Sequence, residues 1–263
     1  MSDGYGRPDR LGQVDRFDRF DRFDMTVMHT VHDALRRELR HIGRAGALIS
    51  PDPRHLLRTT AGWGMFRTAL RVHHSAADDA LWPVLRGALH GRPDDLTRLV
   101  AIEAEHDAIA AIAGVVDEAL AEHGTGHGTE HGTQPDTRPD TGPGTTPRTD
   151  PDTELDLFRE LIGSLVTGLA GHLTHQEEAV FPLIRTALSE EQWKHFCQVH
   201  TQRIAPHAPQ LLPWLLDGAD GRTVAVVLAA FPERARRAYG RRWQPAYAAT
   251  DRWSALAPQA AGT

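Results

Sequence analysis

The sequence contains one unusual pattern twice. Residues 73–83 read HHSAADDALWP and residues 172–182 read HLTHQEEAVFP. When the two prolines are aligned, the leading histidines coincide and a pair of adjacent carboxylates follows each at the same distance. A twofold repeat of histidine plus carboxylate on helical segments is what a metal site inside a helix bundle requires. This pattern constrains the fold more than any other feature of the chain.

The hydrophobic pattern predicts an all-α protein. Apolar residues recur at three- and four-residue spacing in four long segments, at about 24–44, 56–89, 94–122 and 154–188. No stretch alternates between apolar and polar residues as a strand would. We therefore expect an up-down four-helix bundle, followed by an extension of short helices that begins with a capping box at Ser189.

The composition of the remaining segments predicts the domain organisation. Residues 1–24 carry a degenerate Asp-Arg-Phe repeat typical of a solvated arm, and residues 25–188 form the bundle. Residues 123–152, rich in Gly, Pro and Thr, cannot bury apolar surface and are expected to be a flexible linker with incidental histidines. The helical extension covers residues 189–250, and residues 251–263 form a tail.

Charge and composition exclude several classes of protein. The net charge of -6 and the scattered basic residues give no footprint for nucleic acid. No apolar run approaches the roughly 20 residues that span a bilayer, and no signal peptide is visible, so a cytoplasmic protein without a membrane partner is expected. The single cysteine, Cys197, fits a reducing compartment. Motifs of hydrolases, nucleotide-binding proteins and zinc fingers are absent from the sequence.

Four histidines fall on the apolar stripes of the four predicted helices, one on each: His32, His73, His106 and His172. A buried polar group without a partner costs on the order of 1–3 kcal/mol, so four unrelated cases in one core are improbable. A shared metal centre satisfies all four rings at once. Imidazole with carboxylate suits iron, zinc or manganese, and an oxygen-reactive iron pair is the usual occupant of such bundles.

With these residues the chain resembles the hemerythrin-like, or HHE cation-binding, domains of the actinobacterial type. The likeness extends from His32 through the two repeated segments to Leu212-Pro213-Trp214 and Trp243-Gln244-Pro245. It implies a non-haem di-iron centre, bridged by two carboxylates, that binds or senses oxygen, nitric oxide or peroxide without being an enzyme. The residues that this resemblance and the repeat nominate as metal ligands are His32, His73, His74, Asp78, His106, His172, His175 and Glu177.

The sequence departs from the family at both bridging positions. The family has a glutamate four residues after the histidine, where this chain has Ala77 and Gln176. The nearest carboxylates, Asp78 and Glu177, follow at the fifth position, which turns them by roughly 140° from the histidine. Three interpretations remain open: a shifted register that keeps both irons, an altered site that binds metal mainly through histidines, and a bundle that has lost its metal.

Two further questions stay open at this stage. The apolar stripe passes between His73 and His74, so either could face the core. An enzyme that uses peroxide or oxygen and a metal-free scaffold are the alternatives to simple ligand binding. The other polar residues are expected to matter less: Glu103 and Glu105 as possible outer partners of His106, and three solvent-facing histidines in the extension, His195, His200 and His207.

Overall fold

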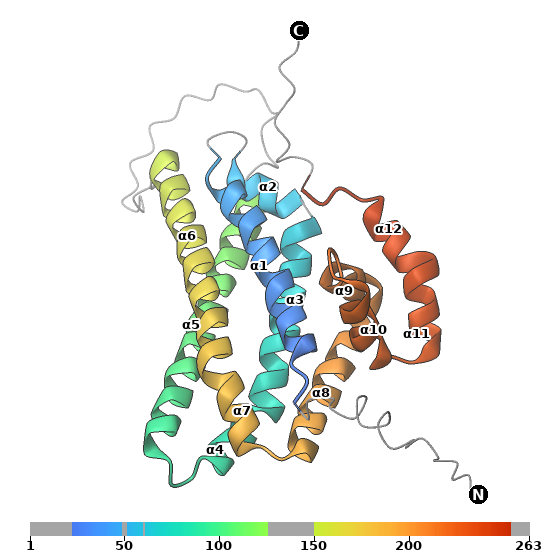
Figure 1. Ribbon diagram of the computed structural model, residues 1–263. Coiled ribbons are helices and arrows are strands. Elements are labelled where there is room, and N and C mark those ends of the chain that lie inside the picture. Colours follow the sequence, from blue (N-terminus) through green and yellow to red (C-terminus); the bar gives the residue numbers. More distant parts are fainter. Residues whose placement is uncertain (1–22, 49–51, 60, 126–149, 254–263) are drawn as a thin grey trace, which may run out of the picture.

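The computed structural model describes residues 23–48, 52–59, 61–125 and 150–253. Within these ranges every regular element is a helix and there is no strand, which confirms the predicted all-α class (Figure 1). In the same ranges, none of the helices has the length and apolar character that crossing a membrane demands. The predicted N-terminal arm lies almost entirely outside the described residues, as do most of the linker and of the tail.

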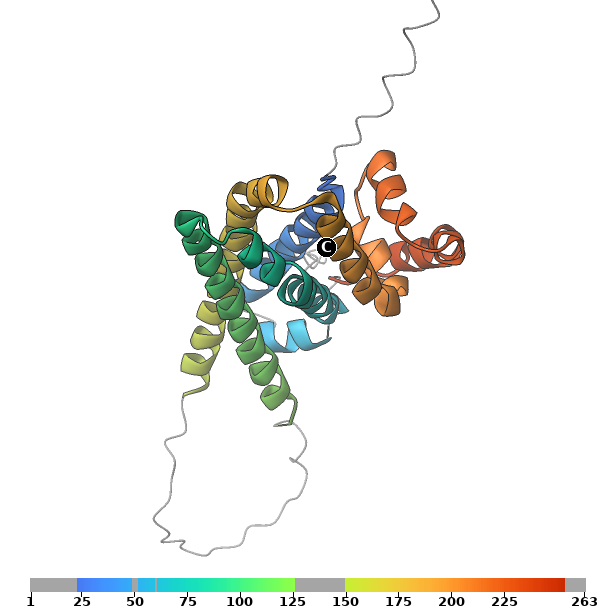
Figure 2. The ribbon, with the colours of Figure 1, turned by 90° about the horizontal axis from the view of Figure 1, so that it is seen from below.

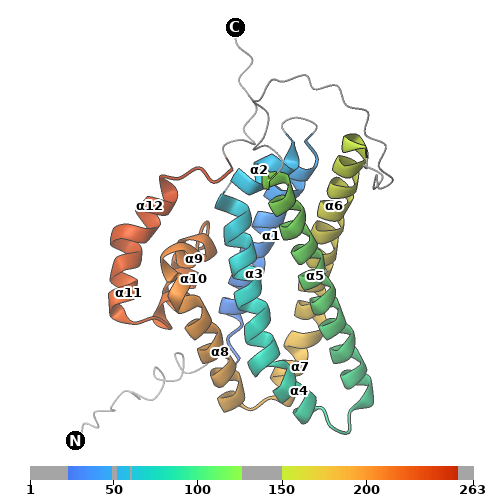
Figure 3. The ribbon, with the colours of Figure 1, turned by 180° about the vertical axis from the view of Figure 1, so that it is seen from behind.

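Four long helices run side by side: α1 (Thr26–Gly46), α3 (Ala61–Ala80), α5 (Pro93–Thr125) and α6 (Pro151–His175). Helix α6 packs against both α5 and α1, and α1 in turn packs against α3 (Figures 1 and 3). Helices α5 and α6 reach a few residues into the predicted linker at its two ends. The four helices bring the histidines of distant segments to one level of the core.

Helix α1 shows why these segments are helical. The six residues of its predicted stripe are between 0% and 3% exposed: Met25, Met28, His32, Leu35, Leu39 and Ile42. Spacings of three and four residues place them on one face, so burying that face stabilises the helix against the neighbours. The single histidine on this otherwise apolar stripe is therefore carried into the interior.

The helix expected at 56–89 is divided in the structure. Its parts are α2 (Pro53–Thr59), α3 and α4 (Trp82–Ala88). The second break falls at Leu81, because Pro83 has no N–H to donate and its ring clashes with the carbonyl four residues earlier. The first of the two repeated segments thus lies at the C-terminal end of α3 and turns into α4.

The helix expected at 154–188 is divided for the same reason. Helix α6 is followed by a π-helical turn, η1 (Gln176–Val180), and by α7 (Phe181–Ala187), which has Pro182 in its first turn. The N–H of Phe181 donates to the carbonyl of Gln176, five residues earlier, so the turn admits one extra residue. Such π turns are frequent at functional sites, and this one carries Glu177.

The C-terminal extension packs against α1 and α3 on one side of the long helices, as the view along their axes shows (Figure 2). It begins with α8 (Glu190–Ile204), where Ser189 and Gln192 form the predicted capping box. The elements that follow are η2 (Ala205–His207), α9 (Ala208–Leu215), α10 (Gly221–Ala229), α11 (Glu233–Ala238), η3 (Tyr239–Trp243) and α12 (Gln244–Ala248).

One buried carboxylate joins the extension to α1. Glu38 is only 2% exposed, and its two oxygens accept hydrogen bonds from the indole N–H groups of Trp214 and Trp253, each at 2.9 Å. A buried charge is tolerated only when both its oxygens are paired in this way. The extension is therefore anchored to the same helix that carries His32.

Candidate metal centre

Six histidines from five helices gather in the core. All are 7% exposed or less: His32 on α1, His73 and His74 on α3, His106 on α5, His172 on α6 and His200 on α8. The first five were predicted from the sequence as candidate ligands. The sixth comes from the extension.

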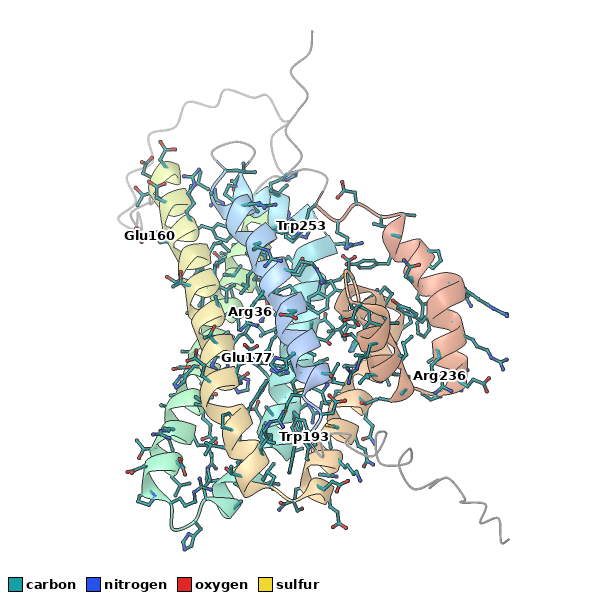
Figure 4. All side chains as sticks on the ribbon, viewed as in Figure 1. Arg36, Glu160, Glu177, Trp193, Arg236 and Trp253 are labelled. Atoms are coloured by element: carbon teal, nitrogen blue, oxygen red, sulfur yellow. The ribbon has the colours of Figure 1, made fainter. Side chains whose placement is uncertain are left out.

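One corner of the site is built around Glu177. One carboxylate oxygen lies 2.8 Å from Nδ1 of His32, and Arg36 donates to both oxygens, at 2.8 and 2.9 Å. Figure 4 shows Arg36 and Glu177 next to each other where α1 meets the chain below α6. Burial raises the pKa of Glu177, but the hydrogen bonds from His32 and Arg36 outweigh this effect and lower it to about 2. Glu177 is thus a fixed anion that holds the His32 ring from behind.

A second carboxylate, Glu105, holds two imidazoles of α6. Its oxygens lie 3.1 Å from Nδ1 of His172 and 2.9 Å from Nδ1 of His175. Burial alone raises the pKa of Glu105, and these hydrogen bonds bring it below the usual value. The two rings differ in depth, since the side chain of His172 is 1% exposed and that of His175 is 40% exposed. His175 therefore sits at the rim, although the sequence nominated it as a ligand.

A third carboxylate stands behind His106. Oδ1 of Asp78 lies 3.3 Å from Nδ1 of His106, and the indole N–H of Trp82 lies 3.2 Å from the same nitrogen while also hydrogen-bonding Asp78. The side chain of Asp78 is 53% exposed, so it reaches this ring from the surface. The indole N–H of Trp82 can only donate, so Nδ1 of His106 accepts this hydrogen bond and the ring proton is on Nε2. Ligation of a metal through Nε2 requires the other tautomer, in which Nδ1–H faces Asp78.

His73 and His74 both face the core, toward different neighbours. The ring of His74 lies 3.5 Å from that of His106 and 6.2 Å from that of His172, measured between centroids. The ring of His73 lies 5.3 Å from His32 and 5.7 Å from His200. Successive residues of a helix point about 100° apart, which is why adjacent histidines can serve two sets of partners.

Burial keeps the six imidazoles neutral. Loss of solvation lowers the pKa of His106 and His200 to about 4, and it lowers the pKa of His73 and His74 well below the usual value. Burial also lowers the pKa of His32 and of His172, although the hydrogen bonds that these rings donate to Glu177 and Glu105 act in the opposite direction. Neutral imidazole is the form that binds metal ions.

The nitrogens that point inward have no hydrogen-bond partner. Eight buried ring nitrogens of the described histidines are in this state: Nε2 of His32, His73, His74, His106, His172 and His200, and Nδ1 of His73 and His200. At 1–3 kcal/mol each, their desolvation costs on the order of 10 kcal/mol, comparable with the whole stability of a domain. The pattern of Nδ1 on a carboxylate with Nε2 free is that of histidines that ligate metals.

A transition metal therefore fits the donor set, although the rings are not yet arranged around one point. Among the described residues, no three His, Cys, Asp or Glu side chains already stand as a group able to hold an ion. His74 and His106 in particular are in contact, so an ion could enter only if their rings rotated apart. The donor chemistry is present, and binding requires side-chain rotation.

The two positions at which the resemblance would place bridging glutamates face a cavity. Ala77 is 2% and Gln176 4% exposed, and both line a small cavity of about 10 Å³ together with His32 and His73. A space of this size holds roughly one water molecule. The replaced positions thus point inward, whereas Asp78 and Glu177 contact Nδ1 atoms on the outer side of the rings.

One expectation about the histidines of the extension was wrong. His200 does not face solvent but is 1% exposed, whereas His195 and His207 are exposed as predicted. The burial of His200 could have been predicted from the sequence of α8. The buried residues of this helix are spaced by three and four positions: Trp193, Phe196, His200 and Ile204.

The two acidic residues considered as possible outer partners of His106 pair with other groups. Glu105 pairs with His172 and His175 instead of with His106. Glu103 pairs with Arg86, at 2.5 Å. Neighbouring helices decide such pairs, and their relative rotation cannot be read from the spacing along one segment.

Comparisons of this chain with protein-family models, with curated proteins and with solved structures give no match. The likeness to hemerythrin-like domains therefore rests on the residues named above and on their placement.

Proposed function

We propose that the protein is a hemerythrin-like four-helix bundle that binds a first-row transition metal, iron by resemblance, on its buried histidines. The observation that carries the proposal is the set of inward nitrogens without a partner, behind which Glu177, Glu105 and Asp78 hold the rings. No hydrogen-bonding network among the described residues accounts for these nitrogens. Ligation of metal accounts for all the Nε2 atoms together.

Of the three interpretations of the sequence, the altered site bound mainly through histidines is the one we favour. Asp78 and Glu177 are engaged behind His106 and His32, and Ala77 and Gln176 offer no bridging carboxylate. A bound ion would supply Lewis acidity and, for iron, reversible oxidation at a coordination position left open by the protein. The chain itself contributes orientation of the imidazoles and exclusion of water.

The cavity, with room for roughly one water molecule, favours a very small ligand. Its lining is apolar apart from His32, His73, the indole of Trp82 or Trp193 and the amide of Gln176, and its volume is about 10 Å³. An organic substrate requires a pocket of roughly 300 Å³ or more. We therefore propose oxygen, nitric oxide or peroxide as the ligand, bound without catalytic turnover.

The test is the metal content of the untagged full chain. Histidines 123, 127 and 131, which could bind metal adventitiously, are replaced by asparagine in every sample. We expect stoichiometric metal by mass spectrometry, a melting temperature that falls when a chelator removes the metal, and a visible spectrum that changes on addition of oxygen or nitric oxide. A chain that takes up no iron, zinc, cobalt or manganese when reconstituted under anaerobic conditions would instead be a metal-free scaffold.

A further inference from the structure

His200, the buried histidine of the extension, lies outside both repeated segments. His200 lies on α8, outside the four long helices, and is 1% exposed. Neither of its ring nitrogens has a hydrogen-bond partner among the residues that the structure describes. Its ring stands edge-on to His73, with centroids 5.7 Å apart, and tilted against Phe196 at 6.1 Å. A packing residue at this position would need no nitrogen atoms at all.

His73 lies from both His32 and His200 at about the separation expected of two ligands of one ion. With metal–nitrogen bonds of about 2.0 Å and tetrahedral angles, the centroids of imidazole ligands lie roughly 5 Å apart. The observed separations are 5.3 Å between His32 and His73 and 5.7 Å between His73 and His200. Five of the eight inward nitrogens without a partner belong to these three rings.

The remaining buried histidines form a separate set on the other side of α3. His74, His106 and His172 lie within 6.2 Å of one another, and neither His106 nor His172 has a ring contact with His200 among the contacts described. The two sets adjoin at His73 and His74, whose ring centroids are 6.1 Å apart. At longer range, His106 influences His73 electrostatically and His32 influences His172. Each set contains three imidazoles.

We infer that His200 is a metal ligand, and that it completes with His32 and His73 a second three-histidine position beside the one formed by His74, His106 and His172. The inference rests on the proposed function, and it adds that the extension forms part of the site. The ion expected there is a divalent first-row metal that prefers nitrogen ligands, such as Fe²⁺, Co²⁺ or Zn²⁺. Helix α8 packs directly on α3, so the helix that carries His200 is fixed against the helix that carries His73.

The experiment is a titration with Co²⁺. The protein is the metal-stripped full chain in which His123, His127 and His131 are replaced by asparagine. Cobalt absorbs in the visible region when it is bound by nitrogen ligands, so occupancy can be followed directly. The variant is His200→Leu, and the matched control is His195→Leu, which changes an exposed histidine of the same helix. We expect two ions in the parent and in the control, and one ion in His200→Leu.

A third variant separates ligation from packing. His200→Cys keeps a metal ligand but changes the donor atom, so it should restore the second ion and add a sulfur-to-cobalt absorption band. Circular dichroism of the metal-stripped samples shows that each variant is folded. Equal binding by the parent and by His200→Leu overturns the role of His200 while leaving the proposed function in place. Absence of cobalt from the parent itself overturns the proposed function.

Discussion

Acidification should destabilise the metal-stripped protein strongly between pH 7 and pH 5. Burial holds the pKa of His106 and of His200 at about 4, whereas histidine in an unfolded chain titrates near 6.5. The unfolded chain therefore binds more protons in this interval. Stability from these groups is fully present above the unfolded pKa and is lost as the pH falls from 6.5 toward 4.

The magnitude follows from the two pKa values. At pH 5 a histidine in the unfolded chain is almost fully protonated, whereas the buried one is almost fully neutral. Each of the two groups therefore lowers the free energy of unfolding by about 2 kcal/mol relative to pH 7. His106 and His200 together give a loss of about 4 kcal/mol, against a typical total of roughly 5–15 kcal/mol. The lowered pKa values of His32, His73, His74 and His172 act in the same direction. Glu177, with a pKa of about 2, loses its contribution only below pH 4.5 and does not affect this interval.

The assay is urea unfolding followed by circular dichroism at pH 7 and pH 5 in the presence of a chelator. The His200→Leu variant serves as the internal control, because removal of one of the two groups should reduce the pH-dependent loss by about 2 kcal/mol, whatever the variant does to stability at pH 7. A loss of less than about 1 kcal/mol in the parent would refute the reasoning, since the buried imidazoles would then be protonated or solvated in the folded state.

Three other predictions follow from contacts away from the histidines. Glu38→Ala leaves the buried indole N–H groups of Trp214 and Trp253 without an acceptor, so chemical denaturation should show a loss of about 2–5 kcal/mol; a loss below about 1 kcal/mol would contradict the anchoring role. Gly62→Ala would put a Cβ 2.2 Å from the ring of Trp253, so the near-ultraviolet circular dichroism of the tryptophans should change and the C-terminal segment should become easier to digest with protease; an unchanged spectrum would show that the ring does not pack there. Burial raises the pKa of the Cys197 thiol to about 12, so its reaction with a disulfide reagent at neutral pH should be slow in the folded protein and fast in urea; equal rates would show that the thiol is accessible.

The prediction of the helices succeeded where a local rule governs the outcome. The stripe of α1 is buried at every predicted position, and the capping box at Ser189 is formed, because both depend on residues within one or two turns. The breaks at Leu81 and at the π turn were missed, although Pro83 and Pro182 are plain in the sequence. A hydrophobic pattern continues across a proline, whereas the hydrogen-bond ladder does not.

The sequence by itself determined that the chain is helical and that His32, His106, His172 and one of the histidines at 73 and 74 are carried into its interior, because periodicity along a helix decides which side chains lie on the buried face. That both His73 and His74 are buried was visible only in the structure. Only the tertiary structure decided how these rings are paired. The rotation and offset of neighbouring helices, which no single segment encodes, bring Glu177 to His32, Glu105 to His172 and α8 against α3. For the same reason the division of the histidines into two sets of three, with His200 in one of them, was visible only in three dimensions.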